Sequence, residues 1–175
     1  MKIPVLTLLY SALAAAACSP LIVDDHSTVG TTNTNNVGGY TSDDATCGSL
    51  SATSKVLQIT PGTARCYWYT NFPPKKPEDA VGGHRAALAF TLTPPQPNWA
   101  FSVNIKSWNG TALIDSYSTV TGTTGGTQTV TMPLSSFNGP SVPNLRNIQS
   151  FVFGSFNVNA GNWQIGPLTL TCATT

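Results

Sequence analysis

Acidic residues occur in two adjacent pairs near the start of the chain, Asp24-Asp25 and Asp43-Asp44. They are four of the seven acidic residues in a chain that is only 9% charged, so their clustering needs a cause. Ca²⁺ prefers carboxylate and carbonyl oxygens, which makes Asp25, Asp43 and Asp44 candidate ligands of a structural calcium ion. Alternatively, the aspartates cap turns and strand ends through hydrogen bonds to the backbone. Residue types alone leave both hypotheses open, and they indicate no other cofactor.

The same residues do not form a recognisable catalytic pair. Glycosidic hydrolysis ordinarily needs two carboxyl groups on opposite sides of a cleft. The only glutamate, Glu78, adjoins Asp79 in a proline-rich loop, and neighbouring loop residues cannot oppose one another. His26 and His84 have no sequence context that marks a general base, and no G-x-S-x-G nucleophile motif occurs. We therefore assign no catalytic residue and expect a protein that is not an enzyme.

Aromatic side chains offer a different chemistry, since exposed rings stack on the C–H faces of sugars while nearby polar groups bind the hydroxyls. Residues alternate between two faces along a strand, and in 100–108 one face is apolar. The other face carries Asn104, Lys106 and Trp108, so Trp108 is the strongest stacking candidate. Tyr117, on the following strand, is expected on the same side.

The turn between these two strands is marked by Asn109-Gly110, the strongest short-range hairpin signal. A two-residue turn there would place Asp115 opposite Asn104. Asn109 also begins an Asn-Gly-Thr sequon for N-glycosylation, and a glycan at this site requires an exposed turn.

The first residues predict secretion. Lys2 precedes an apolar run that ends in Ala15-Ala16-Ala17, which is typical of a signal peptide spanning 1–17 and is too short for a membrane span. Its removal leaves 18–175 with seven basic and seven acidic residues, so nothing favours nucleic acid or anionic lipid. A bacterial lipobox ending at Cys18 is the competing interpretation. We expect an extracellular monomer.

Four cysteines in a secreted chain favour disulfides, and four cysteines allow three pairings. Cys18 precedes the first expected strand and Cys172 closes the last one, which favours Cys18–Cys172 if these strands meet antiparallel. Cys47–Cys66 then follows by elimination.

Short stretches rich in β-branched and aromatic residues, separated by Gly, Pro and Asn, predict an all-β chain. The expected strands are 21–26, 55–60, 65–71, 86–93, 100–108, 111–120, 127–132, 150–157 and 163–172. Many short strands without a βαβ rhythm predict one two-sheet antiparallel β-sandwich. Residues 28–36 are polar enough to be disordered instead.

Several phrases resemble a family of small secreted fungal proteins. They are Cys18–Asp25, Asn35–Asp44, Cys66–Thr70, Thr129–Phe137 and Asn162–Leu168. The resemblance implies a galactose-binding-domain-like jelly roll, a domain also attached to chitin deacetylases and other polysaccharide-active enzymes. The chain departs from the family pattern at His26, where Phe is usual, and at Ala45, where Gly is usual. Cys47 and Cys66 occupy positions that are usually not cysteine.

Together these features favour a secreted, non-catalytic module that binds cell-wall polysaccharide through Trp108, Lys106, Asn104 and Tyr117. The first alternative is a secreted effector or cell-surface interaction protein without sugar affinity. The second is an unrecognised polysaccharide-active hydrolase.

Overall fold

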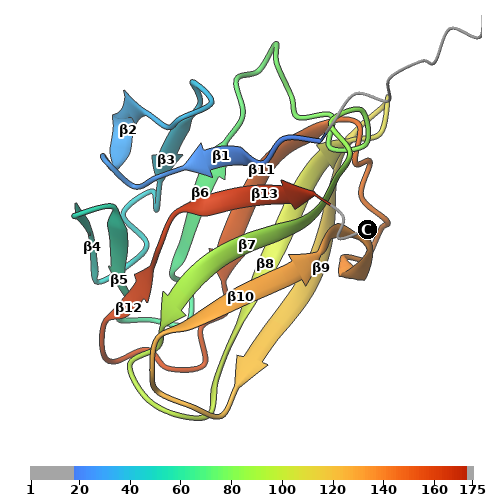
Figure 1. The fold of residues 1–175 in the computed structure, drawn as a ribbon. Helices are drawn as coiled ribbons and strands as arrows, with labels where there is room; N and C mark the ends of the chain where they lie inside the picture. Colours follow the sequence, from blue (N-terminus) through green and yellow to red (C-terminus); the bar gives the residue numbers. More distant parts are fainter. Residues whose placement is uncertain (1–17, 173–175) are drawn as a thin grey trace, which may run out of the picture.

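A computed structural model of the chain describes residues 18–172 (Figure 1). The predicted signal peptide, 1–17, lies outside the described residues. The strands and the single 3₁₀ turn in the described part are β1 Leu21–Asp24, β2 Gly30–Thr34, β3 Tyr40–Ser42, β4 Ser49–Thr53, β5 Val56–Thr60, β6 Tyr67–Asn71, β7 Arg85–Thr93, β8 Trp99–Trp108, β9 Leu113–Gly122, β10 Gln128–Pro133, η1 Leu134–Ser136, β11 Ile148–Gly154, β12 Trp163–Ile165 and β13 Leu168–Cys172. No helix in this part of the chain is long and apolar enough to cross a membrane.

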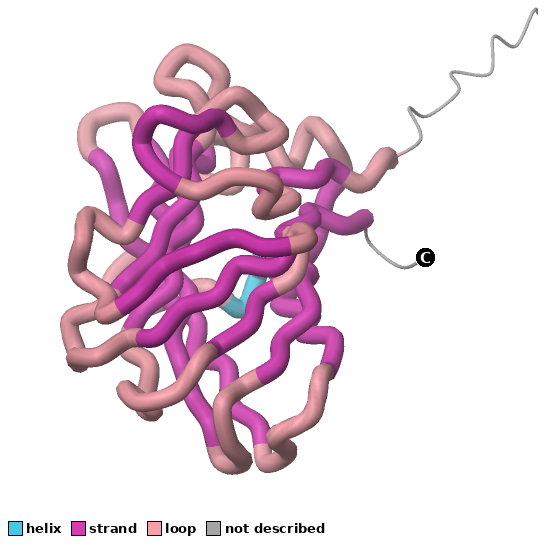
Figure 2. The backbone as a smooth tube through the Cα atoms, turned by 90° about the vertical axis from the view of Figure 1, so that its left-hand side faces the viewer, coloured by secondary structure: helices cyan, strands magenta, loops and turns pink. Residues whose placement is uncertain are grey.

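The strands form two antiparallel sheets. The first sheet has the order β1-β13-β7-β12-β5-β4, with β10 also paired to β7, and the second has the order β2-β3-β6-β11-β8-β9. In Figure 1 the sheet with β13, β7 and β10 lies in front of the sheet with β6, β11, β8 and β9. The view turned by 90° shows almost only strands and loops around one short helical turn (Figure 2). The prediction of an all-β, two-sheet sandwich is confirmed.

The core is built from the inward residues of both sheets. On β8, Phe101, Val103 and Ile105 are at most 1% exposed, as the alternation of the sequence predicts. Three tryptophans join them, and each indole N–H has a hydrogen-bond acceptor, which a buried Trp requires. Trp68 donates to Thr41 Oγ1, Trp99 donates to Thr124 O, and Trp163 donates to Val158 O. Trp99, the first residue of β8, therefore belongs to the core.

Two disulfides hold the ends of the sandwich. β1 and β13 pair antiparallel, and Cys18 is bonded to Cys172 at their joined ends. The second bridge joins Cys47 to Cys66, between the loop after β3 and the start of β6. Both bridges are the predicted ones. Because the sulfur of Cys18 is in a disulfide, it is not available for the thioether of a lipoprotein.

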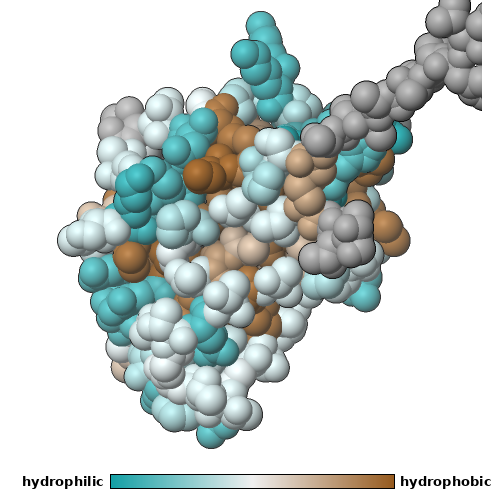
Figure 3. Space-filling model, in the orientation of Figure 1, coloured by the Kyte–Doolittle hydropathy of each residue, from teal (hydrophilic) through white to brown (hydrophobic). Residues whose placement is uncertain are grey.

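The outer faces of the two sheets carry different types of side chain. The front face in Figure 3 is mostly hydrophilic or neutral with small hydrophobic patches. Its outward positions on β7, β10 and β13 are small residues, mainly Ala and Thr. The opposite face, formed by the second sheet, carries tyrosines and charged groups and is hollowed.

Candidate functional site

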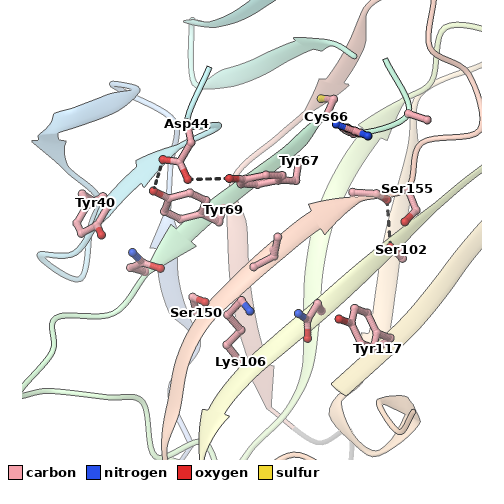
Figure 4. Close-up of a pocket in the computed structure, with 16 residues that line it drawn as sticks. Tyr40, Asp44, Cys66, Tyr67, Tyr69, Ser102, Lys106, Tyr117, Ser150 and Ser155 are labelled. Carbon is pink, nitrogen blue, oxygen red and sulfur yellow. Dashed lines mark hydrogen bonds between the residues drawn. The ribbon is translucent and has the colours of Figure 1, made fainter. Parts of the chain in front are cut away.

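A hollow of about 560 Å³ lies on the outer face of the second sheet (Figure 4). Cross-strand pairing lines up its residues in rows that run across the strands from β6 to β9. The rows are Tyr67, Gly154 and Ser102; Tyr69, Val152, Asn104 and Tyr117; and Asn71, Ser150, Lys106 and Asp115. Neighbouring strands lie about 4.8 Å apart, so three strand spacings separate Tyr69 from Tyr117 by roughly 14 Å. The outward residues of β11 and β8 thus form a floor between the tyrosines of β6 and Tyr117 of β9.

Three tyrosines form the wall on the β6 side. The rings of Tyr67 and Tyr69 are stacked, with centroids 6.2 Å apart and an interplanar angle of 26°. Tyr40, from β3, meets Tyr69 edge to face at 6.0 Å and is 41% exposed. The alternation of β6 puts Trp68 in the core and both neighbouring tyrosines on the groove.

Asp44 connects the two stacked tyrosines. The Tyr67 hydroxyl donates to Oδ2 of Asp44 and the Tyr69 hydroxyl donates to Oδ1, each at 2.8 Å (Figure 4). The hydrogen bond to Asp44, helped by burial and by the charge of the carboxylate, raises the pKa of Tyr67. Burial, followed by the bond to Asp44, raises the pKa of Tyr69. Both phenols are therefore held in the protonated form.

The turn that carries Asp44 is tied to β6. Thr46 Oγ1 accepts from the Tyr67 N–H at 3.2 Å, and its single proton is donated within the turn to the Asp43 carbonyl at 2.6 Å. Within the turn, the Asp43 carboxylate accepts backbone N–H groups from Ala45 and Cys47. The Cys47–Cys66 disulfide adds a covalent link next to Tyr67.

The far side of the groove carries one paired charge cluster. Asp115 Oδ1 accepts from Lys106 Nζ at 2.7 Å and from Asn104 Nδ2 at 2.6 Å. Burial alone would raise the pKa of Asp115, but these two bonds and the Lys106 charge outweigh it and hold the pKa below its usual value. The Asn104 amide oxygen accepts from Ser116 N–H, so both ends of the amide have a partner.

A second hollow, of about 660 Å³, continues from the first and is more apolar. The second hollow extends to Trp108 and Leu113 at the end of the β8–β9 hairpin. The residues that line both hollows are Tyr40, Asn71, Lys106 and Ser150. Trp108 is 40% exposed. Together the two hollows form one groove, which we call the tyrosine groove.

The structure brings the predicted ligand-binding residues to this one face. Lys106, Asn104 and Tyr117 line the first hollow and Trp108 lines the second. The predicted register, with Asp115 directly opposite Asn104, is wrong, because Lys106 is opposite Asp115; the Asn104 side chain nevertheless donates to Asp115. The hairpin loop has four residues, 109–112, rather than two, and the resulting two-residue shift preserves the face.

Tyr67, Tyr69 and Tyr40 were not predicted as site residues. The alternation of Tyr67 and Tyr69 around Trp68 was visible, but alternation does not tell which face is buried. The useful signal was chemical, because a tyrosine can keep its hydroxyl at the surface more readily than a phenylalanine. Asn109 is exposed at the hairpin tip, where its side-chain oxygen accepts from the N–H groups of Thr111 and Ala112.

The aspartates proposed as calcium ligands all have partners. Asp25 Oδ1 accepts from the N–H and hydroxyl of Ser27, and Oδ2 lies 3.4 Å from Lys55 Nζ. Asp43 caps its turn and Asp44 binds the tyrosines, as described above. Among residues 18–172 no group of three or more His, Cys, Asp or Glu side chains could hold a metal ion. The geometry thus favours the hypothesis of turn architecture.

This arrangement predicts no calcium dependence of stability. We expect the same melting temperature in millimolar CaCl₂ and in EDTA, for the natural chain and for a variant with Asp43→Asn and Asp44→Asn. Thermal unfolding followed by circular dichroism measures it. A calcium-dependent rise that the double variant loses would instead support the calcium hypothesis.

Ala45 adopts the left-handed conformation, with φ +57°. A side chain with a Cβ pays about 1 kcal/mol or more for this region, whereas glycine does not. The greater entropy of glycine in the unfolded chain offsets part of this gain, so we expect Ala45→Gly to raise the free energy of unfolding by about 0.5–1 kcal/mol. Chemical denaturation measures it, with Ala52→Gly, in the middle of β4, as the control that should lower stability.

The raised tyrosine pKa values predict a loss of stability in alkali. In the unfolded chain the tyrosines lose their protons above about pH 10, whereas in the folded chain Tyr67 and Tyr69 still hold theirs. The rise in pH therefore stabilises the unfolded state relative to the folded state. We expect the free energy of unfolding to fall between about pH 10 and pH 11, and to fall less in the Tyr67→Phe, Tyr69→Phe variant. Equal slopes for the two proteins would contradict this assignment.

Comparison with known proteins gives similarity at the level of structure. No family model matches the sequence, and no curated protein matches it. The family 11 carbohydrate-binding module of the cellulosomal cellulase Lic26A-Cel5E of Clostridium thermocellum superimposes with a TM-score of 0.57 at 20% identity, over 90% of this chain and 97% of the module. A family 11 module from that organism, in complex with a β-1,3-1,4-mixed-linked tetrasaccharide, gives 0.56 at 20% identity, over 90% and 98%.

A family 30 carbohydrate-binding module of the Clostridium thermocellum cellulase Cel9D-Cel44B gives a TM-score of 0.57 at 14% identity, over 90% of this chain and 95% of the module. At such identities the similarity shows a shared fold. The chain has the β-sandwich jelly-roll fold of carbohydrate-binding modules.

Proposed function

We propose that the chain is a secreted, non-catalytic module that binds polysaccharide in the tyrosine groove. The observation that carries the proposal is the open groove across the second sheet, with tyrosines on one side, Tyr117 and the Lys106–Asp115 pair on the other, and Trp108 at one end. Rings supply stacking surfaces and the polar groups supply hydrogen bonds, which are the two needs of a sugar chain.

The position of the groove agrees with this proposal. The outer face of the first sheet presents small Ala and Thr side chains around β7 and β13, so it offers no ring for stacking. The solved modules of the same fold include one complexed with a mixed-linked tetrasaccharide. A secreted state is supported by two disulfides, which persist in oxidising compartments.

The two carboxylates at the groove argue against hydrolysis. A glycosidase keeps one carboxyl group protonated as the general acid. The lowered pKa of Asp115 keeps it ionised, and both oxygens of Asp44 are occupied by the hydroxyl groups of Tyr67 and Tyr69.

The second candidate is a secreted interaction protein without sugar affinity. The apolar end of the groove favours it, since Trp108 and Leu113 are both large, adjacent and at least 40% exposed. Such a pair would also suit a protein partner.

Retention on insoluble glycans separates the two candidates. We expect the purified chain to be retained on at least one of cellulose, mixed-linked β-glucan and chitin, and Trp108→Ala to weaken retention. Ile22→Ala is the matched control, because Ile22 is an equally exposed apolar residue on the other sheet. If none of these glycans retained the chain, the proposal would be contradicted and the secreted interaction protein would be favoured.

A further inference from the structure

The Asp44 carboxylate has an unusual set of partners for a surface aspartate. Each of its oxygens accepts one phenol proton, from residues two apart on β6. A phenol is free to rotate its hydroxyl and, when exposed, its ring. Fixing both hydroxyls on one carboxylate therefore also fixes the tilt of the two rings against each other.

Asp44 is itself held in place. It has φ +48°, a region that Asp and Asn tolerate better than other side chains, and its N–H donates to Ser42 Oγ. Thr46 Oγ1 accepts from the Tyr67 N–H and donates to the Asp43 carbonyl, which ties this turn to β6, and the Cys47–Cys66 disulfide anchors the end of the turn beside Tyr67. The turn that carries Asp44 is therefore fixed to β6 or to the residue just before it at both ends. We call Asp44, the Thr46–Tyr67 bond and the Cys47–Cys66 disulfide the brace.

The direction of these bonds has a consequence for a ligand. Because both phenol protons point at Asp44, the Tyr67 and Tyr69 oxygens can meet a ligand only as acceptors, and the Tyr69 oxygen also has a hydrogen bond with the Ser42 side chain. Sugar hydroxyls can donate to them, whereas a carboxylate group cannot. The other charges at the site oppose this selectivity only weakly, because Lys106 is paired with Asp115 and Arg65 is exposed at the rim.

We propose that Asp44, braced by the Cys47–Cys66 disulfide, is a positioning residue that orders Tyr67 and Tyr69 and makes their hydroxyls acceptors for the hydroxyl groups of a neutral glycan. This inference rests on the proposed function, and it adds the residue that preorganises the site and the charge class of the ligand. Preorganisation raises affinity because less ordering remains to be done on binding.

A double-mutant cycle on Asp44 and the two phenols tests the coupling. The natural chain is compared with Asp44→Asn, with Tyr67→Phe and Tyr69→Phe together, and with all three changes. Asn keeps the backbone conformation of Asp44, and Asp79→Asn controls for the lost charge at a loop position outside the groove. Affinity is measured by calorimetry with two neutral probes, the mixed-linked tetrasaccharide and chitotetraose. The third probe is the mixed-linked tetrasaccharide in which primary hydroxyls are oxidised to carboxylates.

We expect Asp44→Asn to weaken binding of the neutral probes about fivefold, the value of one net hydrogen bond, and to narrow the preference for neutral over oxidised probe. In the Phe background the same change should have less than a twofold effect, because the partners of Asp44 are gone. An equal loss in both backgrounds overturns the proposal, since Asp44 would then act without the phenols.

A measurement without ligand separates this inference from the proposed function. In ¹³C-tyrosine-labelled protein, Asp44→Asn should shift the Cζ resonances of Tyr67 and Tyr69, and Asp79→Asn should not. If the resonances do not shift, Asp44 does not order the two tyrosines and the proposal is overturned. A chain retained on insoluble glycan that binds neither neutral probe overturns the inference alone, and a chain that binds no glycan overturns both proposals.

The disulfide is tested in the same cycle. Cys47→Ala with Cys66→Ala should weaken neutral-probe binding by a similar factor, provided that circular dichroism shows a folded chain. It should add little to Asp44→Asn, because both changes release the same two rings. Full affinity in the folded disulfide variant overturns its part in the brace.

Discussion

Replacement of Asp24 with alanine is expected to lower the free energy of unfolding by about 3 kcal/mol. Asp24 is 1% exposed at the end of β1. Its carboxylate accepts from the Thr70 hydroxyl and the His26 N–H, and lies 3.3 Å from Nδ1 of the buried His26 ring. Removing one member of a buried hydrogen-bonded network leaves the Thr70 hydroxyl and the His26 N–H without a partner and without solvent, which is costly.

Asp25→Ala is the matched control for this prediction. Asp25 adjoins Asp24 in sequence but is partly exposed and serves a local turn with Ser27. We expect a loss of about 1 kcal/mol or less there. Urea denaturation measures both free energies of unfolding, provided that their dependence on urea concentration is the same in the natural chain and the variants. Similar losses for the two variants would mean that burial does not set the role of each aspartate in the pair.

The sequence predicts the central part of the fold well, because alternation and turn residues are local signals. β8 shows this best, since its apolar residues face the core and its polar residues face the groove. The strands between residues 30 and 53 were missed because they contain few apolar residues and rely on pairing with β6 and β5. The final predicted strand divides at Gly166-Pro167 into β12 and β13, which pair with different stretches of β7.

The hairpin register illustrates a local signal that was overruled by another. Asn109-Gly110 favours a two-residue turn, but the Asn109 side chain caps the N–H groups of Thr111 and Ala112. The Asn109 N–H then bonds the carbonyl of Ala112, which closes a four-residue loop. The two turn types differ little in free energy, so composition alone does not decide between them.

The role of Asp44 lay beyond sequence reasoning for a different reason. Its partners, Tyr67 and Tyr69, are more than twenty residues away, and only the pairing of β3 with β6 brings the turn over them. The sequence offers two roles for this aspartate, a calcium ligand or a turn cap, and neither is a bond to two phenols. Two phenols now account for both of its oxygens.

Removal of the two stacked rings is expected to have the largest effect on binding. Tyr67→Ala with Tyr69→Ala should weaken the affinity for a retained glycan about 100-fold, because central aromatic residues of a binding site each contribute about 1–2 kcal/mol. Tyr67→Phe with Tyr69→Phe keeps the rings and loses only the hydroxyls. We expect that variant to lose about fivefold to tenfold.

The difference between these two variants isolates stacking from hydrogen bonding. Calorimetry on the neutral probe gives the affinities, and thermal unfolding confirms that each variant is folded. Ile22→Ala, on the other sheet, should bind as the natural chain does. If the Phe and Ala variants were equally weak, the hydroxyls would supply the whole effect and the rings would not be stacking surfaces. A large gap between them would instead place the sugar faces on Tyr67 and Tyr69, with Tyr117 opposite across the floor of β11 and β8.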